Sequence, residues 1–268
     1  MLITLTTDFG DSEYVGSMKG VIAAMTPDAH VIDLTHGIRR HSIRHGAYAL
    51  MTAVPHFPFA VHVAVVDPGV GTERKALAIA CEGAYLVGPD NGVLIPAARK
   101  LGMKEVRRIE NRALMRPSLS PTFHGRDVFA PLAAHLAAGI KFRDVGPAVT
   151  EWVDLDWGEA KWTDARLEAQ VICTDRFGNV ITNVSSESWS RRAQVGESFE
   201  LSVGGVSRRL RFVGTYADAD PQALVAVVGS GGYLEIAVNR GSAEDALRIQ
   251  EGAALVLVTL PTPHRGND

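Results

Sequence analysis

Val61-His62-Val63-Ala64-Val65-Val66, followed at once by Asp67-Pro68-Gly69, predicts a short buried strand and the turn that ends it. The run is rich in β-branched residues and bounded by turn formers, as the strands of a parallel sheet covered by helices usually are. Asp67 would then stand at the carboxyl end of the strand, the edge where open α/β sheets bind their ligands. Because Gly69 and Gly71 tolerate positive φ angles, the turn can bring Arg74 back toward Asp67. The residues alone leave two interpretations of this Asp–Arg pair open: part of a reactive site, or an ion pair that only stabilises the loop.

A second stretch, Pro121-Thr122-Phe123-His124-Gly125-Arg126-Asp127, presents an imidazole and charged side chains from a loop rich in Pro. Functional side chains are often carried by loops that a rigid scaffold positions. The two stretches together offer an Asp, an Arg and a His. These three groups can orient and polarise a water molecule without a metal.

The first half of the chain alternates extended and helical patterns. We expect strands at 2–7, 31–34, 61–66, 76–80 and 84–87, and helices at 15–25, 43–54, 92–101 and 128–138. Such alternation predicts βαβ units and a sheet with helices on its faces. Residues 1–150 are therefore expected to form a Rossmann-like layered α/β domain.

The pattern changes after residue 150. The segment 151–164 is predicted to be a linker, because its first part, 151–161, contains two Trp, several acids and little periodicity. From 165 to 268 the chain gives short extended runs with turn signals, including Gly204-Gly205 between two of them, which is typical of a hairpin. We expect a smaller C-terminal β-barrel or sandwich domain.

Composition excludes some classes of function. A formal net charge of −3 and the lack of a dense Lys/Arg run argue against a nucleic-acid partner. No run approaches about 18 apolar residues, so no membrane span is predicted. The N-terminus lacks the basic region of a signal peptide, and a cytoplasmic location is expected. Cys81 and Cys173 stand in apolar runs and are expected to be buried, reduced thiols.

Further motifs accompany Asp67, Arg74 and His124, in one order over roughly the whole chain. They are Thr6-Thr7-Asp8-Phe9-Gly10, Gly88-Pro89-Asp90-Asn91-Gly92, Asp175-Arg176-Phe177-Gly178-Asn179 with Thr182-Asn183, and the run from Gly229 to Asn239. This combination resembles the S-adenosyl-L-methionine (SAM) hydroxide adenosyltransferases, a family related to the SAM-dependent chlorinases and fluorinases. The resemblance implies that SAM is hydrolysed to adenosine and L-methionine, without a cofactor or a metal.

The resemblance also implies roles for individual residues. Asp67, Arg74 and His124 match the family's catalytic Asp–Arg–His triad, and Asp8 is expected to bind the ribose hydroxyls unless it is only a helix N-cap or a turn former. The other residues expected to bind substrate are Phe123, Asp175, Phe177, Asn179, Tyr216, Ser230, Tyr233, Glu235 and Asn239. The family's pocket lies between the first domain of one subunit and the second domain of its neighbour, so a homotrimer is expected.

The chemistry of SAM fits such a site. Its 5′ carbon already carries a good leaving group, a neutral thioether, so the difficult part is the weak nucleophile water. Holding one water molecule in line with the C–S bond supplies orientation and desolvation. We expect Arg74 to hold Asp67, and Asp67 and His124 to orient the water and receive its proton.

Four alternatives remain. A halogenase is disfavoured, because the fluorinase has Tyr-Ser where His124-Gly125 stand here and Tyr in place of Asp67, whose carboxylate would repel a halide. A SAM or adenosine sensor without turnover would leave the triad unexplained. A metal-dependent hydrolase could use Asp8, Asp11, Asp67 and His124. A serine hydrolase is weaker still, because the Ser230 stretch lacks the first glycine of a nucleophile elbow.

Overall fold

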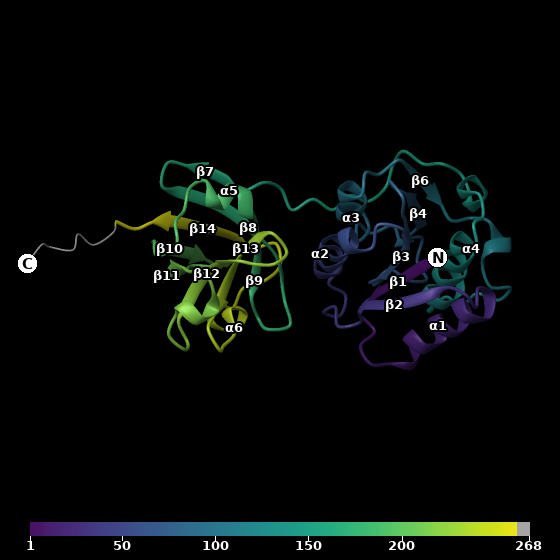
Figure 1. Ribbon diagram of the computed structural model, residues 1–268, viewed down its shortest axis with the longest axis horizontal. Helices are drawn as coiled ribbons and strands as arrows, with labels where there is room; N and C mark the ends of the chain where they lie inside the picture. Colours follow the sequence, from purple (N-terminus) through teal and green to yellow (C-terminus); the bar gives the residue numbers. More distant parts are fainter. Residues whose placement is uncertain (262–268) are drawn as a thin grey trace, which may run out of the picture. The chain divides into compact units, whose positions relative to one another are not determined.

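A computed structural model describes residues 1–261, and its chain divides into two compact units at the junction of Asp156 and Trp157 (Figure 1). This junction falls inside the segment 151–164 that was predicted as a linker. Part of that segment is regular structure, because Lys161–Thr163 forms strand β7 by pairing with Arg166–Glu168. A strand of this length carries too little periodicity to be read from the sequence.

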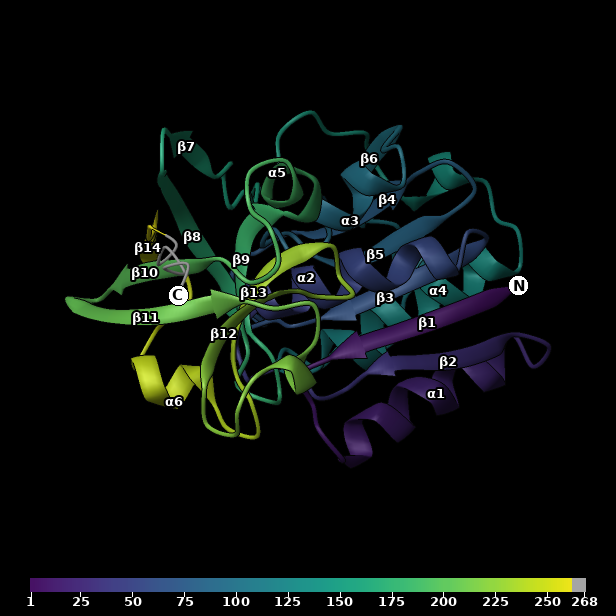
Figure 2. The same ribbon diagram turned by 60° about the vertical axis from the view of Figure 1, so that its left-hand side comes forward.

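The first unit contains a six-stranded sheet in the order β2-β1-β3-β5-β4-β6. The strands are β1 (Leu2–Thr7), β2 (His30–Thr35), β3 (Ala60–Val65), β4 (Ala76–Ala80), β5 (Tyr85–Pro89) and β6 (Glu105–Arg108). Figure 2 shows β2, β1, β3 and β5 side by side, and these neighbours are parallel. β4 runs antiparallel to β5 and β6, so the sheet is mixed.

Helices cover both faces of this sheet. Helix α1 (Glu13–Met25) and helix α4 (Ala130–Ala137) lie on one side, and α2 (Ile43–Ala53) and α3 (Ile95–Lys100) lie on the other (Figure 1). Ile3 and Leu5 of β1 are fully buried against Met18 and Ile22 of α1 and Leu132 of α4. The predicted layered α/β domain is confirmed. Cys81 and Cys173 are both buried, as predicted.

The strand order creates a crevice at one edge of the sheet. From β1 the chain passes through α1 to β2, and from β2 it passes through α2 to β3 on the other side of β1. Connections that leave neighbouring parallel strands in opposite directions open a binding crevice at their carboxyl ends. Thr7 is paired with Val65, so Asp8 and Asp67 leave the sheet next to each other at this edge.

Two loops meet at the same edge. The loop after β3 begins with two tight turns, in which the Val70 N–H donates to the Asp67 carbonyl and the Thr72 N–H to the Gly69 carbonyl. Gly71 has φ +80°, and a Cβ atom there would stand 2.5 Å from the Pro121 carbonyl oxygen of the second loop. Only glycine allows this approach, so Gly71 fixes how closely the two loops pack.

The second unit is a closed β-barrel. Its strands are β8 (Arg166–Thr174), β9 (Val180–Ser185), β10 (Ser198–Val203), β11 (Val206–Phe212), β12 (Leu224–Val228), β13 (Tyr233–Val238) and β14 (Ala254–Thr259). Pairing of β14 with both β10 and β8 closes the ring, which leaves β7 outside it on β8. Trp189 of helix α5 (Ser186–Ser190) and Phe199 are fully buried in its core. The sequence predicted either a barrel or a sandwich for this unit, and the structure is a barrel.

The helices of residues 1–261 are all too short or too polar to cross a membrane. The 13 residues of α1 fall well short of the about 20 apolar residues that a span needs.

His62 of β3 should make the folded state sensitive to acid. Its side chain is fully buried and its Nδ1 lies 2.8 Å from Thr4 Oγ1. Burial lowers the pKa of His62 to about 4, and the Phe57 carbonyl opposes this only in part. The unfolded chain, with a histidine pKa of about 6.5, therefore binds a proton between these pH values that the folded chain does not bind. The free energy of unfolding should fall by up to about 3 kcal/mol from this group as the pH is lowered from 6.5 to 4.

Urea unfolding of the wild type and of His62→Gln at several pH values measures this effect. The variant should lose less stability on acidification, whereas His56→Gln, at an exposed position, should follow the wild type. Equal pH dependence in wild type and His62→Gln would rule out the proposed role of His62.

Gly71→Ala should lower stability by about 1 kcal/mol or more, because it adds a clash with the Pro121 carbonyl to a positive φ angle. Gly69→Ala is the matched control: its Cβ would make ordinary contacts with Arg74 Cβ and Cγ at 3.5 Å and with Thr72 Oγ1 at 3.6 Å. Thermal unfolding of both variants checks the prediction, and equal midpoints would contradict it.

Candidate active site

The centre of the site is an ion pair between Asp67, just after β3, and Arg74, just before β4. Arg74 Nε donates to Asp67 Oδ1 at 3.0 Å, and Nη2 donates to Oδ2 at 2.5 Å. The two side chains are only 5% and 8% exposed. A bidentate pair of this kind fixes the plane of the carboxylate as well as its position.

Arg74 is held on two further sides. Its Nη1 donates to the Lys75 carbonyl at 2.9 Å, and its guanidinium lies over the Phe129 ring at 5.6 Å. The backbone N–H of Arg74 donates to Thr72 Oγ1 at 3.3 Å. The cation is thus oriented by the loop that carries it and by an aromatic face.

His124 joins the pair through the same guanidinium. Its Nδ1 lies 3.0 Å from Arg74 Nη2. Because a guanidinium only donates, Nδ1 must accept, and the proton of the neutral ring is then on Nε2. Burial lowers the pKa of His124, Arg74 lowers it further, and Asp67 and Asp127 oppose the shift. The imidazole is therefore neutral near pH 7.

The pKa of Asp67 is shifted in the opposite direction to that of His124. Burial raises the pKa of its carboxyl, and the charge and hydrogen bonds of Arg74 oppose this only in part. A carboxylate with a raised pKa is a better proton acceptor than an ordinary one. The site therefore combines a base, a cation and a neutral imidazole, with the cation of Arg74 within hydrogen-bonding distance of both other groups.

A cavity of about 320 Å³ lies beside these groups, lined among others by Asp8, Asp67, Phe123 and His124. Asp8 Oδ2 accepts the backbone N–H of His41 at 2.9 Å. The alternative that Asp8 caps a helix is wrong, because the N-cap of α1 is Ser12. Its carboxylate instead faces the crevice at the end of β1.

Aromatic rings form one wall of this cavity. Phe123 is buried, and its ring lies 5.0 Å from that of Tyr14 and 6.0 Å from that of Phe9, both edge-on. All three residues line the cavity. The three rings give the cavity an apolar side, whereas Asp8 and Asp67 contribute charged groups to it.

The second unit has a cavity of its own, of about 810 Å³, that the barrel residues Asp175, Phe177, Asn179, Tyr216, Ser230 and Glu235 line. Asp175 Oδ1 accepts the N–H groups of Phe177 and Asn179 at 2.8 and 2.9 Å, and Oδ2 accepts Asn179 Nδ2 at 3.0 Å. These bonds close the turn between β8 and β9. They also point the carboxylate of Asp175 in one fixed direction.

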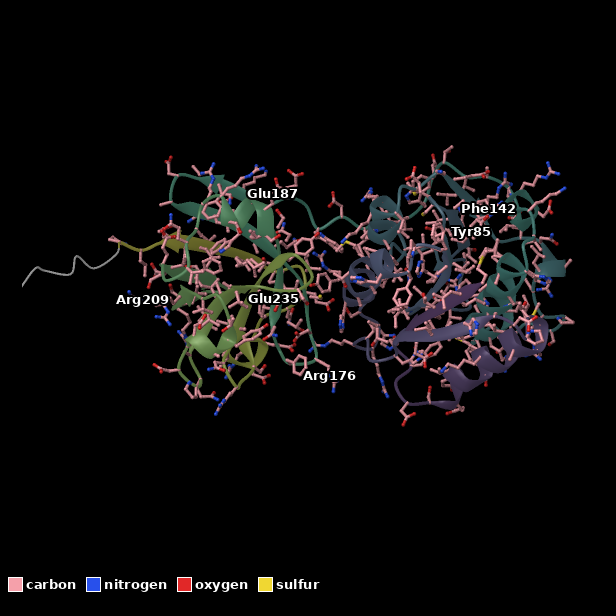
Figure 3. The ribbon with its side chains drawn as sticks, viewed as in Figure 1. Tyr85, Phe142, Arg176, Glu187, Arg209 and Glu235 are labelled. Atoms are coloured by element: carbon pink, nitrogen blue, oxygen red, sulfur yellow. The ribbon has the colours of Figure 1, made fainter. Side chains whose placement is uncertain are left out.

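A second carboxylate faces this cavity. Glu235 is 7% exposed and accepts the Tyr216 hydroxyl at 3.0 Å; Figure 3 labels its position in the barrel. Burial raises the pKa of Glu235, the Tyr216 hydrogen bond opposes this, and the charge of Asp175 adds to it. The Phe177 side chain at the cavity is 70% exposed. Two carboxylates and exposed rings suit a ligand with a cationic group.

Two residues of the predicted binding set, Tyr233 and Asn239, line neither cavity. Asn239 Nδ2 donates to the Ala219 carbonyl at 2.7 Å, and Tyr233 interacts through its hydroxyl with Trp157. β13 pairs regularly with β12 here, so alternation places Tyr233 and Glu235 on the same side of the strand, but only Glu235 of the two lines the cavity. Ten of the predicted side chains therefore line the two cavities, Arg74 bonds to two of these ten, and Tyr233 and Asn239 line neither cavity.

Some cavity residues were missed by the sequence analysis. Arg40 and His41 line the first cavity, together with Tyr14, and Thr215 and Arg240 line the second. A signal did exist for Arg40 and His41, because they follow a predicted strand and precede a predicted helix, at the same sheet edge as Asp8. His41 also has φ +64°, which presents its N–H to Asp8.

Residues 1–261 contain no cluster of three or more His, Cys, Asp and Glu side chains placed to hold a metal ion. Asp67 and His124, two of the four groups considered as metal ligands, present their oxygens and Nδ1 to Arg74 instead.

Comparison with known proteins gives a consistent result over both units. Residues 3–146 match the SAM hydroxide adenosyltransferase N-terminal domain, and residues 169–256 match the C-terminal domain of the same family. A protein of Thermus thermophilus named (R)-S-adenosyl-L-methionine hydrolase is 42% identical over 270 residues, with 94% of this chain and 97% of the relative covered. One of the same name from Salinispora tropica is 40% identical, with 94% and 96% covered.

A more distant relative, a fluorinase of an Actinoplanes species, is 25% identical, with 89% of this chain and 91% of the relative covered. Among solved structures, an uncharacterized conserved protein from Thermotoga maritima superposes with a TM-score of 0.87 at 36% identity. That match covers 96% of this chain and all of the other. With both domain models matched in order, the chain belongs to the SAM hydroxide adenosyltransferase family.

Proposed function

We propose that this chain hydrolyses (R)-S-adenosyl-L-methionine to adenosine and L-methionine, by in-line attack of one water molecule on the 5′ carbon. Relatives that are 40% and 42% identical carry the name of this hydrolase. The observation that carries the proposal is the Arg74 guanidinium, which holds both Asp67 oxygens and His124 Nδ1 beside a cavity that Asp8 also lines. The reaction uses no cofactor and no metal, because the sulfonium leaves as a neutral thioether.

His124 orients the water molecule. With Nδ1 accepting from Arg74, the Nε2–H of the neutral ring donates to the water oxygen and leaves a lone pair for the 5′ carbon. His124 in this state gives a hydrogen bond and does not take the proton. The sequence-based expectation gave two tasks, orienting the water and receiving its proton, to Asp67 and His124 together. We now assign the first task to His124 and the second to Asp67.

Asp67 receives the proton of the attacking water. Burial raises its pKa, so it is a stronger base than an exposed carboxylate. Arg74 holds the carboxylate in place and stabilises the negative charge that develops on the oxygen during attack. Fixing one water molecule in a site that excludes others lowers the barrier through orientation and desolvation.

The two cavities hold different parts of the substrate. Asp8 binds the ribose hydroxyls with its two oxygens, and Phe123 supports the adenosine. Asp175 and Glu235 bind the cationic methionine end, Asn179 binds its carboxylate or the ribose, and Ser230 lies at the same cavity. Phe177 and Tyr216 supply ring faces that attract a sulfonium.

Water is a better nucleophile for this site than a halide. The buried Asp67 carboxylate repels an incoming anion. At Gly125, where the fluorinase has serine, a Cβ atom would stand 3.2 Å from Met18 Sδ and 3.3 Å from the Phe123 ring. The position has neither a hydroxyl for a halide nor room for one without a shift.

We also propose that the active assembly is a homotrimer in the cytoplasm. The first cavity carries the triad and the second carries the carboxylates for a cationic ligand, so neither holds a complete site. In the proposed trimer, the first unit of one subunit is completed by the second unit of its neighbour. The exposed Phe177 and Tyr216 rings would then be covered when the site is complete.

The test is product analysis with the two sulfonium epimers of SAM, supplied separately in chloride buffer. Chromatography should give adenosine and methionine from the (R) epimer at a faster rate than from the (S) epimer. Formation of 5′-chloro-5′-deoxyadenosine would contradict hydrolysis. Binding of SAM without turnover would identify a sensor instead.

Asp67→Asn, Arg74→Ala and His124→Ala should each lower kcat by about two orders of magnitude or more, because the base, the cation and the orienting group act on one water molecule. Adenosine binding, measured by calorimetry, should change little. The matched control is the Arg99–Asp154 pair, an ion pair of 2.6 Å whose side chains are both 49% exposed. Arg99→Ala should keep normal turnover; a triad variant that also keeps it would lose its place in the mechanism.

Glu235→Gln should raise the KM for SAM by about tenfold with little change in kcat, because it removes a charge but retains an acceptor for the Tyr216 hydroxyl. Glu187→Gln is the control, since Glu187 is an exposed carboxylate of the same barrel that pairs with Arg191; Figure 3 labels both glutamates. Steady-state kinetics decides: an unchanged KM would exclude a role of the Glu235 charge in substrate binding.

A further inference from the structure

We propose that Asp127 is a positioning residue of this site: its buried carboxylate holds the loop that presents His124 to Arg74. The proposal rests on the proposed function, because it assigns His124 to the reaction. Asp127 is fully buried in the single π-helical turn Gly125–Phe129 that follows His124. A buried carboxylate is costly unless it is fully hydrogen-bonded, so its presence here needs a reason.

The carboxylate of Asp127 is saturated with donors from its own loop. Oδ1 accepts Arg116 Nη1 at 3.1 Å and Arg126 Nε at 2.7 Å. Oδ2 accepts the backbone N–H of Ser120 at 2.7 Å and Arg126 Nη2 at 2.9 Å. One side chain thus ties residues 116, 120 and 126 together.

The main chain of Asp127 closes the same loop. Its N–H donates to the Phe123 carbonyl at 3.2 Å, and its carbonyl accepts the Arg116 N–H at 3.0 Å. Arg126, one of the carboxylate's partners, lies over the Phe123 ring at 4.9 Å. The segment from 116 to 127 is therefore folded around Asp127, with Phe123 and His124 at its cavity side.

This loop is in turn fixed against the loop that carries Asp67 and Arg74. The Pro121 carbonyl presses on Gly71, where a Cβ atom has no room. Two anchors therefore set the 3.0 Å distance from His124 Nδ1 to Arg74 Nη2: the Gly71–Pro121 contact between the loops and Asp127 within one of them. Asp127 acts through His124 and is not a catalytic residue.

Asp127 also acts on His124 through its charge. Its carboxylate raises the pKa of His124, against burial and the Arg74 charge, and Asp67 acts in the same direction as Asp127. The other charged or titratable groups of this loop and cavity are Arg126, which pairs with Asp127, and Asp8, Tyr14, Arg40 and His41 of the cavity. A carboxylate that stabilised only the fold would leave kcat and the pH–rate profile unchanged when it is replaced, so the titration of His124 read together with kcat separates the two roles.

The experiment compares Asp127→Asn, Asp127→Glu and the wild type by kcat, KM and the pH–rate profile. It also follows the NMR titration of the His124 ring without substrate.

We expect Asp127→Asn to lower kcat by about tenfold or more with KM changed less than about twofold. The pKa of His124 and the acid limb of kcat should both move to lower pH. In Asp127→Glu, the pKa of His124 and the acid limb of kcat should lie closer to their wild-type values than in Asp127→Asn. Asp144→Asn, at an exposed carboxylate that pairs with Arg143, is the control and should change none of these.

A second variant covers the case in which Asp127→Asn does not fold. Arg116 pairs with Asp127 from a half-exposed position, so Arg116→Met leaves the Asp127 charge less neutralised. The pKa of His124 should then rise, opposite to its change in Asp127→Asn. An unchanged His124 titration in the folded variants would overturn the proposal, whether or not stability falls. Because this titration needs no turnover, a chain that fails to hydrolyse SAM can be told apart from a failure of the positioning proposal.

Discussion

Asp67 and Arg74 are held together almost without solvent, and the other groups of the site are arranged around their two parallel hydrogen bonds. In water such a pair contributes little, but here both charges are desolvated, so their geometry is strongly determined. Removing one partner would leave a buried charge. The same guanidinium fixes the tautomer of His124, because it can only donate to Nδ1. One cation thereby orients both the proposed base and the proposed donor to water.

The fold supplies this pair from elements that are rigid. β3 is buried along its whole length and delivers Asp67 to the sheet edge beside Asp8, where the connections of β1 and β3 diverge. Arg74 returns to the same place because the intervening loop turns twice and Gly71 tolerates the Pro121 carbonyl. His124 arrives from a distant loop that is closed around Asp127. The second unit offers a complementary surface, with two carboxylates and exposed rings on a barrel that has no free edge on its ring of seven strands.

Much of the scaffold could be predicted from local sequence. The strands Leu2–Thr7 and Ala76–Ala80 were predicted at their observed bounds, because each run is apolar or alternating and ends at turn residues. β6 and β7 were missed, since four and three residues carry too little pattern. That Asp67 stands at the binding edge followed from the strand before it.

The meeting of Arg74 with His124 did not follow from local pattern, because 50 residues separate them and only the resemblance to a family joined them. Tyr233 was assigned to the site through the resemblance of the Gly229–Asn239 run to a family, and it does not line the second cavity. Asp127 was overlooked because its partners lie in an irregular loop. The tautomer of His124 is a property of the contact with Arg74, and no sequence pattern encodes it.

In the proposed reaction, one oriented water molecule attacks the 5′ carbon of SAM. Hydrolysis of SAM in ¹⁸O-labelled water, followed by mass spectrometry of both products, tests it most directly. The label should enter the 5′-hydroxyl of adenosine and be absent from methionine. Adenosine without the label, or a 5′-halogenated nucleoside in its place, would contradict the account.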